Sequence, residues 1–258
     1  MTLLFEIIIC FLAGMGAGLG TGFAGMSAAA VISPMLITFL DMPAYEAVGI
    51  ALASDVLASA VSAYTYGKNK NLDIRNGFVM MIAVLAFTFV GSFAASKVPN
   101  STMGSFSTVM TLLLGIKFIV KPVMTTKEKM TETSPRKRFV QSVICGSVVG
   151  FICGFVGAGG GMMMPLLLTS VLGYELKTAV GTSVFIMTFT ALTGAGSHFM
   201  IGGMPLLLPL VLCIVSTLLW ARIAARFANK ASAATLNRAT GVVLTILGGA
   251  IFLVNLLK

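Results

Sequence analysis

The chain has 258 residues, of which 57% are hydrophobic and only 10% are charged. A soluble domain carries roughly 25% charged residues, and the 8 acidic and 17 basic residues here cannot cover the surface of one. The composition therefore excludes a soluble enzyme, a nucleic-acid-binding protein and a secreted disulfide scaffold. It predicts an all-α integral membrane protein with several spans, and the net charge of +9 fits basic clusters in cytoplasmic loops.

Six stretches of the chain contain no Lys, Arg, Asp or Glu. They are 7–40, 76–96, 98–116, 139–174, 178–221 and 239–257. A helix needs about 20 residues to cross a bilayer. The stretches of that length each predict one span, and 178–221 predicts two. A further span is expected over 44–66, which is apolar except for Glu46 at its edge and Asp55 in its middle.

The stretches 7–40 and 139–174 are too long for one crossing and too short for two, and glycines interrupt both. In each case the glycines precede a short apolar segment, 27–40 in the first stretch and 162–172 in the second. We therefore expect a full helix, an unwound link and a half-length helix in each stretch. For Gly14, Gly18 and Gly22, which are spaced by four, we favour close helix packing over a binding role.

These two stretches also resemble each other, which predicts an internal repeat. Three motifs recur in order about 132 residues later in the chain. Gly22-Phe23-Ala24-Gly25 pairs with Gly154-Phe155-Val156-Gly157, Pro34 with Pro165, and Ala47-Val48-Gly49 with Ala179-Val180-Gly181. The predicted organisation is a first transmembrane repeat over 1–121, a basic cytoplasmic linker over 122–138 and a second repeat over 139–258.

The basic residues predict the topology. If both short segments cross the membrane, every Lys and Arg except Lys97 and Lys258 falls on one side, which the positive-inside rule makes cytoplasmic. Each half then crosses five times, so the halves are inverted repeats, and both termini lie outside the inner (cell) membrane. The alternative, in which the short segments do not cross, leaves Arg222, Arg226, Lys230 and Arg238 on the wrong side.

The two links predict a binding site near the middle of the membrane. Non-helical backbone survives at membrane depth only inside protein or against a wet cavity, and half-helix N-termini expose N–H groups that suit an anion. The residues that we expect to bind substrate are Ser27, Ala28, Ala158, Gly159, Gly160, Gly161, Thr182 and Ser183. The glycines at 157–161 do not form a nucleotide-binding P-loop, because no Lys-Ser/Thr pair follows them.

Asp55 and His198 are the candidates for proton coupling or gating. A carboxylate at the centre of a span costs about 2.5–3.5 kcal/mol on insertion scales, so Asp55 must be paired, protonated or in contact with water. The alternative is a protonated carboxyl that is hydrogen-bonded to a neighbouring helix. His198, the one histidine of the chain, stands near the end of a span, where an interfacial role competes with a proton relay. Other hydroxyls, such as Ser54, Ser59 and Thr193, are expected to line an anion path or to bond backbone carbonyls.

The repeated Gly-Phe-x-Gly, Pro-x-Leu and Ala-Val-Gly motifs resemble those of the sulfite exporter TauE/SafE family, over almost the whole chain. The second copy is the more typical, whereas Met26 to Ala30 replace the Gly-rich tract in the first. The position of Asp55 also resembles one that is often acidic in this family. The resemblance implies a secondary transporter that exports a small sulfur-containing anion, such as sulfite, sulfoacetate or another organosulfonate.

Other functions are weighed against this one. A passive anion channel and a carboxylate transporter on the same fold stay open, whereas an intramembrane enzyme and a metal-ion importer are disfavoured because the spans lack the required clusters. We expect no cofactor, no catalytic residue and no metal site. The expected partners are the anion and membrane lipids but no nucleic acid, and assembly into a homo-oligomer is left open.

Overall fold

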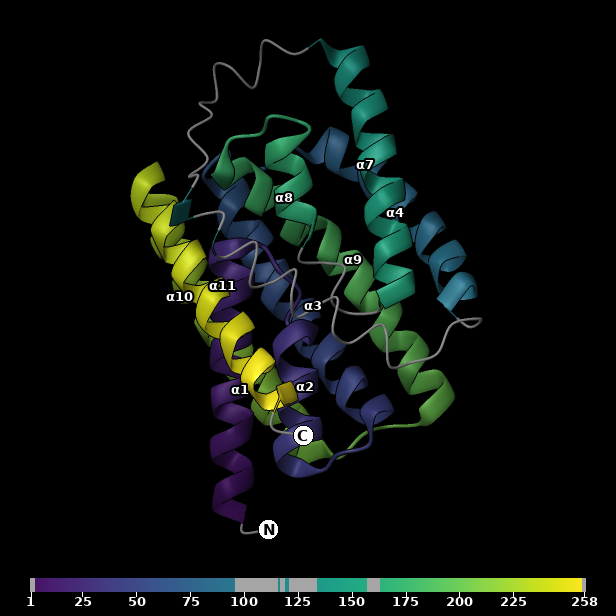
Figure 1. The fold of residues 1–258 in the computed structure, drawn as a ribbon, viewed down its shortest axis with the longest axis vertical. Helices are drawn as coiled ribbons and strands as arrows, with labels where there is room; N and C mark the ends of the chain where they lie inside the picture. Colours follow the sequence, from purple (N-terminus) through teal and green to yellow (C-terminus); the bar gives the residue numbers. More distant parts are fainter. Residues whose placement is uncertain (1–2, 96–115, 117–118, 121–133, 157–162, 257–258) are drawn as a thin grey trace.

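The computed structural model describes residues 3–95, 116, 119–120, 134–156 and 163–256. Within these residues the chain forms helices and no strands, which confirms the all-α prediction (Figure 1). The helices are α1 (Leu3–Ala24), α2 (Ala29–Leu40), α3 (Ala44–Lys68), α4 (Ile74–Ala95), α7 (Pro135–Val156), α8 (Met163–Ser170), α9 (Leu176–Gly202), α10 (Leu207–Lys230) and α11 (Ala233–Leu256). The predicted span 98–116, apart from Ile116, and the linker up to residue 133 lie outside the described residues.

The outer surface of the helices suits a lipid environment. Four of the described helices are long and apolar enough to cross a membrane by length and composition: α1, Tyr45–Lys68 of α3, Leu176–Met200 of α9, and α10. Large apolar side chains on the outward faces are exposed, among them Phe11, Ile82, Ile144 and Leu219. A contiguous apolar surface of this kind is unfavourable in water and favourable against acyl chains.

The helices pair across the two halves of the chain. The first helix of each half packs along the fourth helix of the other half, so α1 lies along α10 and α7 lies along α4. The long helices α3 and α9 pack against each other and thereby join the halves. This exchange is reciprocal, as expected if the halves are two copies of one unit, although the inverted repeat itself stays a prediction.

Glycines allow the closest of these contacts. A Cβ atom built at Gly18 would lie 2.6 Å from the carbonyl oxygen of Thr217 on α10, and Gly14 and Gly22 meet α10 equally closely. The predicted packing role of this glycine series is therefore confirmed. Gly146 and Gly150 serve α7 in the same way, since Cβ atoms there would collide with the backbone of Met80 and Val84 on α4.

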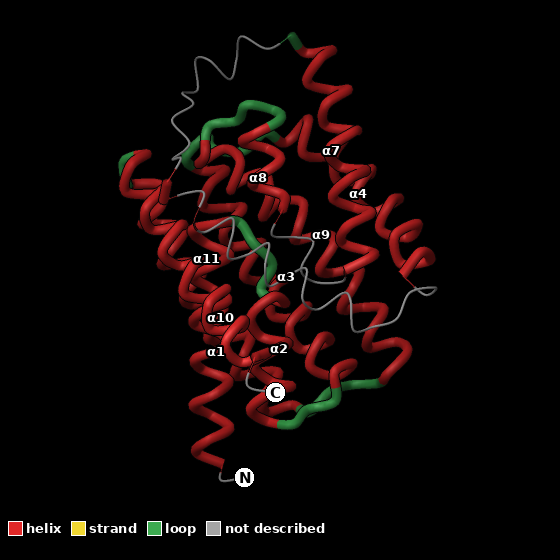
Figure 2. The backbone as a smooth tube through the Cα atoms, viewed as in Figure 1, coloured by secondary structure: helices red, strands yellow, loops and turns green. Residues whose placement is uncertain are grey.

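The half-length helices occupy opposite ends of the molecule. α1 ends inside the bundle, and the link at 25–28 appears at mid-height as a loop from which α2 returns toward the end where α1 began (Figure 2). α8 lies toward the other end (Figure 1). With 12 and 8 residues, α2 and α8 are about 18 Å and 12 Å long, short of the ~30 Å hydrocarbon core. The expected full helix, link and half helix are thus present in the first half.

The connections fall into two groups at the two ends of the bundle. The loops 41–43 and 203–206 lie at the end where α1 starts, and we call this the N-terminal end (Figure 2). The loops 69–73, 171–175 and 231–232 lie at the other end, which we call the basic end. Hydrogen bonds join the first of these loops and the start of α9 to the last turn of α10: Asn71 Nδ2 donates to Asn229 Oδ1 over 2.7 Å, and Lys177 Nζ donates to the Asn229 carbonyl over 3.0 Å.

Candidate functional site

The first link ends α1 through a glycine in the left-handed region. Gly25 has φ of +66°, and its N–H donates to the Thr21 carbonyl over 3.0 Å, which is the usual way for glycine to close a helix. A Cβ at Gly25 would also lie 3.1 Å from Val180 Cα on α9. Both the backbone conformation and the close approach of α9 therefore require glycine at this position.

Side chains from three other helices complete the backbone hydrogen bonding of the link. Tyr66 Oη donates to the Gly22 carbonyl (2.8 Å), Thr240 Oγ1 to the Phe23 carbonyl (3.0 Å) and Ser183 Oγ to the Gly25 carbonyl (2.6 Å). The donors come from α3, α11 and α9. Unwound backbone is tolerated at this depth because protein groups replace the missing helical bonds, and two of these groups belong to the second half of the chain.

The start of α2 lies beside Asp55, the carboxyl group in the middle of a candidate span. Ser27 Oγ donates to Asp55 Oδ2 over 2.6 Å and accepts the N–H of Ala29 over 3.3 Å. Ser59 Oγ donates to Asp55 Oδ1 over 2.7 Å. Asp55 is only 1% exposed. A helix N-terminus carries a partial positive charge that favours an acidic group, so the protein's own carboxyl group lies where an anion would bind.

The predicted binding residues lie at different places. Ser27, Ala28 and Ser183 surround the first link together with Asp55, and all four are buried. Thr182 is buried as well, but its Oγ1 accepts the N–H of Asp73 over 3.2 Å at the start of α4. It therefore faces the basic end rather than the link. Ala158, Gly159, Gly160 and Gly161 lie outside the described residues.

His198 lies at the N-terminal end, away from this group. Its ring stacks on Tyr45 with centroids 4.3 Å apart, and its Nδ1 is 3.2 Å from the Tyr45 carbonyl oxygen. Both rings line a cavity of about 140 Å³ together with Glu46. Since His198 follows Ser183 by 15 residues of one helix, about 22 Å separates them along α9. The structure does not bring His198 to Asp55.

At each end of the bundle, one carboxylate accepts a hydrogen bond that joins two elements of the fold. Glu46 Oε1 accepts the N–H of Leu206 over 2.7 Å at the start of α10. At the basic end, Asp73 Oδ2 accepts a 2.7 Å bond from Tyr174 Oη. Burial, together with the neighbouring Asp73, raises the pKa of Tyr174 well above its usual range. Tyr174 thus remains a neutral hydrogen-bond donor that joins the loop before α9 to the start of α4.

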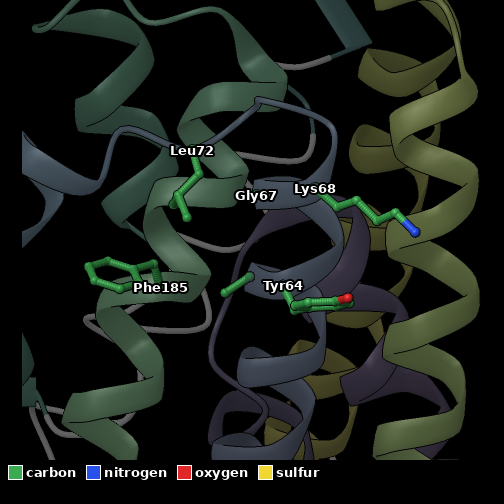
Figure 3. A pocket seen from close by; sticks show the side chains of 6 residues that line it. Tyr64, Gly67, Lys68, Leu72 and Phe185 are labelled. Atoms are coloured by element: carbon green, nitrogen blue, oxygen red, sulfur yellow. The ribbon is translucent and has the colours of Figure 1, made fainter.

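An open pocket of about 490 Å³ lies at the basic end between α3 and α9. Figure 3 shows Leu72 and Phe185 on one side of Gly67, and Tyr64 and Lys68 on the other. Tyrosine and lysine beside an apolar wall are typical of a membrane–water interface. The described residues contain no group of three or more His, Cys, Asp or Glu that could hold a metal ion.

Two residues that form the site are not among those that the sequence predicts to bind substrate. They are Tyr66, which the sequence favours as an interfacial aromatic residue, and Thr240, and both bond the first link. Ser54 and Thr193 follow the expected alternative, because each donates to the backbone carbonyl four residues earlier. Hydroxyl residues on apolar helices look alike in a sequence, and only the packing shows which of them reach another helix.

Membrane-spanning helices with an unwound link that leads into a half-length helix are typical of polytopic membrane transporters. A model of the sulfite exporter TauE/SafE family matches residues 10–251. The chain therefore belongs to this family, and it is a multi-pass membrane transporter for a small molecule.

Several relatives are similar over most of the chain. YdhB of Bacillus subtilis, named a probable membrane transporter protein, is 24% identical over 216 residues, which cover 82% of this chain and 86% of YdhB. YunE, with the same description and organism, is 27% identical over 199 residues that cover 72% of each chain. A probable membrane transporter protein of Haemophilus influenzae is 25% identical over 267 residues, which cover 96% of this chain and 98% of that protein.

Proposed function

We propose that the protein is a secondary transporter that exports a small sulfur-containing anion, such as sulfite, sulfoacetate or another organosulfonate. The observation that carries the proposal is the half helix α2, which begins at mid-depth with its N-terminus beside the buried Asp55. Family membership supports the choice of a sulfur oxyanion. An anion that leaves an inside-negative cell gains about 2.3 kcal/mol per charge per 100 mV, so the membrane potential favours export.

The anion binds where the two half helices begin. Ala158, Gly159, Gly160 and Gly161, which precede α8 in the sequence, are the candidates in the second half, because residues with small or no side chains leave backbone N–H groups accessible to an anion. Ser27, Ala28, Thr182 and Ser183 are the further candidates from sequence. Asp55 already bonds Ser27 at the start of α2. This supports a division of roles in which Asp55 carries a coupling proton and α8 provides most of the substrate contacts.

We further propose that the basic end faces the cytoplasm and that both termini face outward in the inner membrane. Lys68 and Lys177 lie in or beside the loops of the basic end, as the positive-inside rule requires. α1 begins, and α11 ends, toward the opposite end of the bundle (Figure 1). Accessibility labelling of single cysteines in intact cells, at the loops 69–73 and 203–206, tests the orientation without reference to the substrate.

The substrate is tested by electrogenic transport. Purified protein in proteoliposomes is challenged on a solid-supported membrane with sulfite, sulfate, sulfoacetate, taurine, acetate and chloride. We expect a saturable current for sulfite or for one sulfonate. Saturation by carboxylates alone would keep the site and change the substrate, whereas a conductance that never saturates would make the protein a passive anion channel.

The role of Asp55 is tested in the same assay with Asp55→Asn. The amide keeps the size of the side chain. Its oxygen can accept the hydrogen bond of one of the two serines and its NH2 can donate to the other serine oxygen, but it cannot exchange a proton. We expect binding of the anion to persist and the pH dependence of transport to be lost. Ser54→Ala is the matched control, since this neighbouring buried hydroxyl bonds the Ile50 carbonyl instead. If the Asp55→Asn protein shows the same pH-dependent transport as the unmodified protein, Asp55 does not carry the coupling proton.

A further inference from the structure

A buried row of polar side chains runs along α3 from Asp55 to the basic end. Its members are Asp55, Ser59, Ser62 and Tyr66, and their spacing of four, three and four residues places them on one face of the helix. Asp55 is 1% exposed and the other three are 0% exposed. Eleven residues separate the first from the last, so the row is about 16 Å long. We call it the α3 polar row.

The two ends of the α3 polar row form hydrogen bonds, and its middle does not. Ser59 Oγ donates to Asp55 Oδ1 over 2.7 Å, and Tyr66 Oη donates to the Gly22 carbonyl over 2.8 Å. Ser62 Oγ is buried and bonds no described protein group. A buried hydroxyl without a protein partner usually binds water. Ser62 therefore stands where one water would connect Ser59 to Tyr66.

We propose that the α3 polar row conducts the proton of Asp55 to and from the basic end. The proposal rests on the coupling role of Asp55 proposed above. The Ser59 hydroxyl, which donates to Asp55, first turns toward Ser62. A proton that leaves the Asp55 carboxyl then binds the Ser59 oxygen while Ser59 releases its own proton to Ser62, and Ser62 passes one through the bridging water to Tyr66. Tyr66 turns from the Gly22 carbonyl and gives its hydroxyl proton to solvent water at the basic end, so every hydroxyl ends neutral and one proton has moved from Asp55 to that water.

The row reaches polar groups at the basic end. Tyr66 lies two residues before the end of α3, and its carbonyl oxygen accepts the N–H of Asn71 over 2.9 Å. Asn71 in turn bonds Asn229, and Lys68 beside the row is exposed. These contacts place the end of the α3 polar row beside the basic loops, which is the side with which the proposed path exchanges its proton.

No other charge competes for Asp55 among the described residues. α2, which packs on α3, carries no titratable side chain. The titratable or charged groups of α3 itself and of the other helices packed on it are Tyr45, Glu46, Tyr64, Tyr66, Lys68, Glu6, Cys10, Lys177, His198, Cys213, Arg222, Arg226 and Lys230. None of them bonds Asp55, whose partners are the hydroxyls of Ser27 and Ser59 and the backbone N–H of Ala28.

The test measures proton exchange at Asp55 directly, without a substrate. The reconstituted protein undergoes a pH jump between about pH 3 and about pH 9, a range that contains both the ordinary pKa of a carboxyl group and the raised pKa of a buried one. Rapid infrared spectroscopy follows the C=O band of the protonated carboxyl group, and the band that disappears in Asp55→Asn belongs to Asp55. We expect Ser62→Ala and Tyr66→Phe to slow its change roughly tenfold, the effect of about 1.4 kcal/mol in barrier.

Ser54→Ala is again the control, because it removes a buried hydroxyl from the same helix but off the α3 polar row; its rate should equal that of the unmodified protein. Ser62→Ala breaks no protein hydrogen bond, so it tests conduction even if Tyr66→Phe fails to fold. Equal rates in Ser62→Ala and the unmodified protein would overturn the path while leaving the coupling role intact. No Asp55 band that responds to pH would overturn both the path and proton coupling.

Discussion

The long helices α3 and α9 share a place in the fold but differ in chemistry. They pack against each other and contain 25 and 27 residues. The repeated motifs align α3 with the part of α9 that lies 132 residues later. In this alignment the α3 polar row corresponds, in order, to Met187, Ala191, Gly194 and His198 of α9. The α3 polar row therefore has no counterpart at the aligned positions of α9, while the glycine contacts α1–α10 and α7–α4 occur in both halves.

Under the predicted repeat, this difference shows how two copies of one framework can be specialised. The packing glycines and the half helices are backbone features that occur in both halves. In the proposed mechanism the ionisable group and its serine partners are needed once, because one proton carrier is sufficient for coupling. Substitutions in α3, α9 and their neighbours can test this difference between the two helices.

The largest effect is expected from moving a carboxyl group into α9. Met187→Asp places a carboxyl at a position that is 4% exposed, without donors equivalent to Ser27 and Ser59. The cost of a carboxylate at mid-span is about 2.5–3.5 kcal/mol, so the thermal midpoint of unfolding should fall strongly. Met187→Leu is the control, and a Met187→Asp protein as stable as this control would mean that both helices tolerate an acid.

The glycine contacts should respond alike in both halves. Gly18→Ala and Gly150→Ala each force a methyl group into the backbone of the partner helix, and overpacking of this kind costs about 1–3 kcal/mol. Gly196→Ala on α9 has open space around its new methyl group, so it should be neutral or stabilising. The three variants are compared by chemical denaturation in detergent. A loss of stability in Gly18→Ala alone would contradict a shared framework.

Ser183→Ala should weaken the contact of α9 with the first link. It leaves the buried Gly25 carbonyl without the 2.6 Å bond from Ser183, and a buried group without its partner costs about 1–3 kcal/mol. Thr188→Ala on the same helix removes a hydroxyl that bonds only its own helix and should change stability less. Protease susceptibility near residue 25 measures the effect. Equal digestion of the two variants would argue against a stabilising role for the hydrogen bond between Ser183 and the Gly25 carbonyl.

The smallest effect is expected at the N-terminal end. Glu46→Ala removes the acceptor for the Leu206 N–H, and loss of a helix cap costs about 1 kcal/mol. Glu46→Gln keeps an acceptor oxygen and should retain most of the stability. If both substitutions lower the unfolding midpoint equally, the charge at the helix terminus matters more than the hydrogen bond.

Much of the fold could be predicted from sequence because membrane insertion constrains length and charge. The lengths of 7–40 and 139–174 required a break and a half helix, and the described helices agree in the first half. Asp55 was conspicuous because a charge in mid-span is costly. Gly146 and Gly150 could have been found as well, since they follow Gly14 and Gly18 by 132 residues.

The contacts within the site could not be read in this way. Ser27 and Asp55 are 28 residues apart, and nothing in an apolar sequence shows which faces of two helices meet. Thr182 and Ser183 are neighbours in the sequence, but their side chains bond different parts of the fold, because successive helical residues point about 100° apart. One bonds the start of α4 and the other the first link.

The hydrogen bonds around the first link also bear on how the protein is made. Ser183 follows Gly25 by 158 residues, and Thr240 follows Phe23 by 217 residues. When the first link enters the membrane during synthesis, these two donors are not yet translated. The nascent first half must therefore keep its link hydrated or sheltered by the insertion machinery until α9 and α11 arrive. A chain cut in the linker should mature only when both fragments are produced in the same cell.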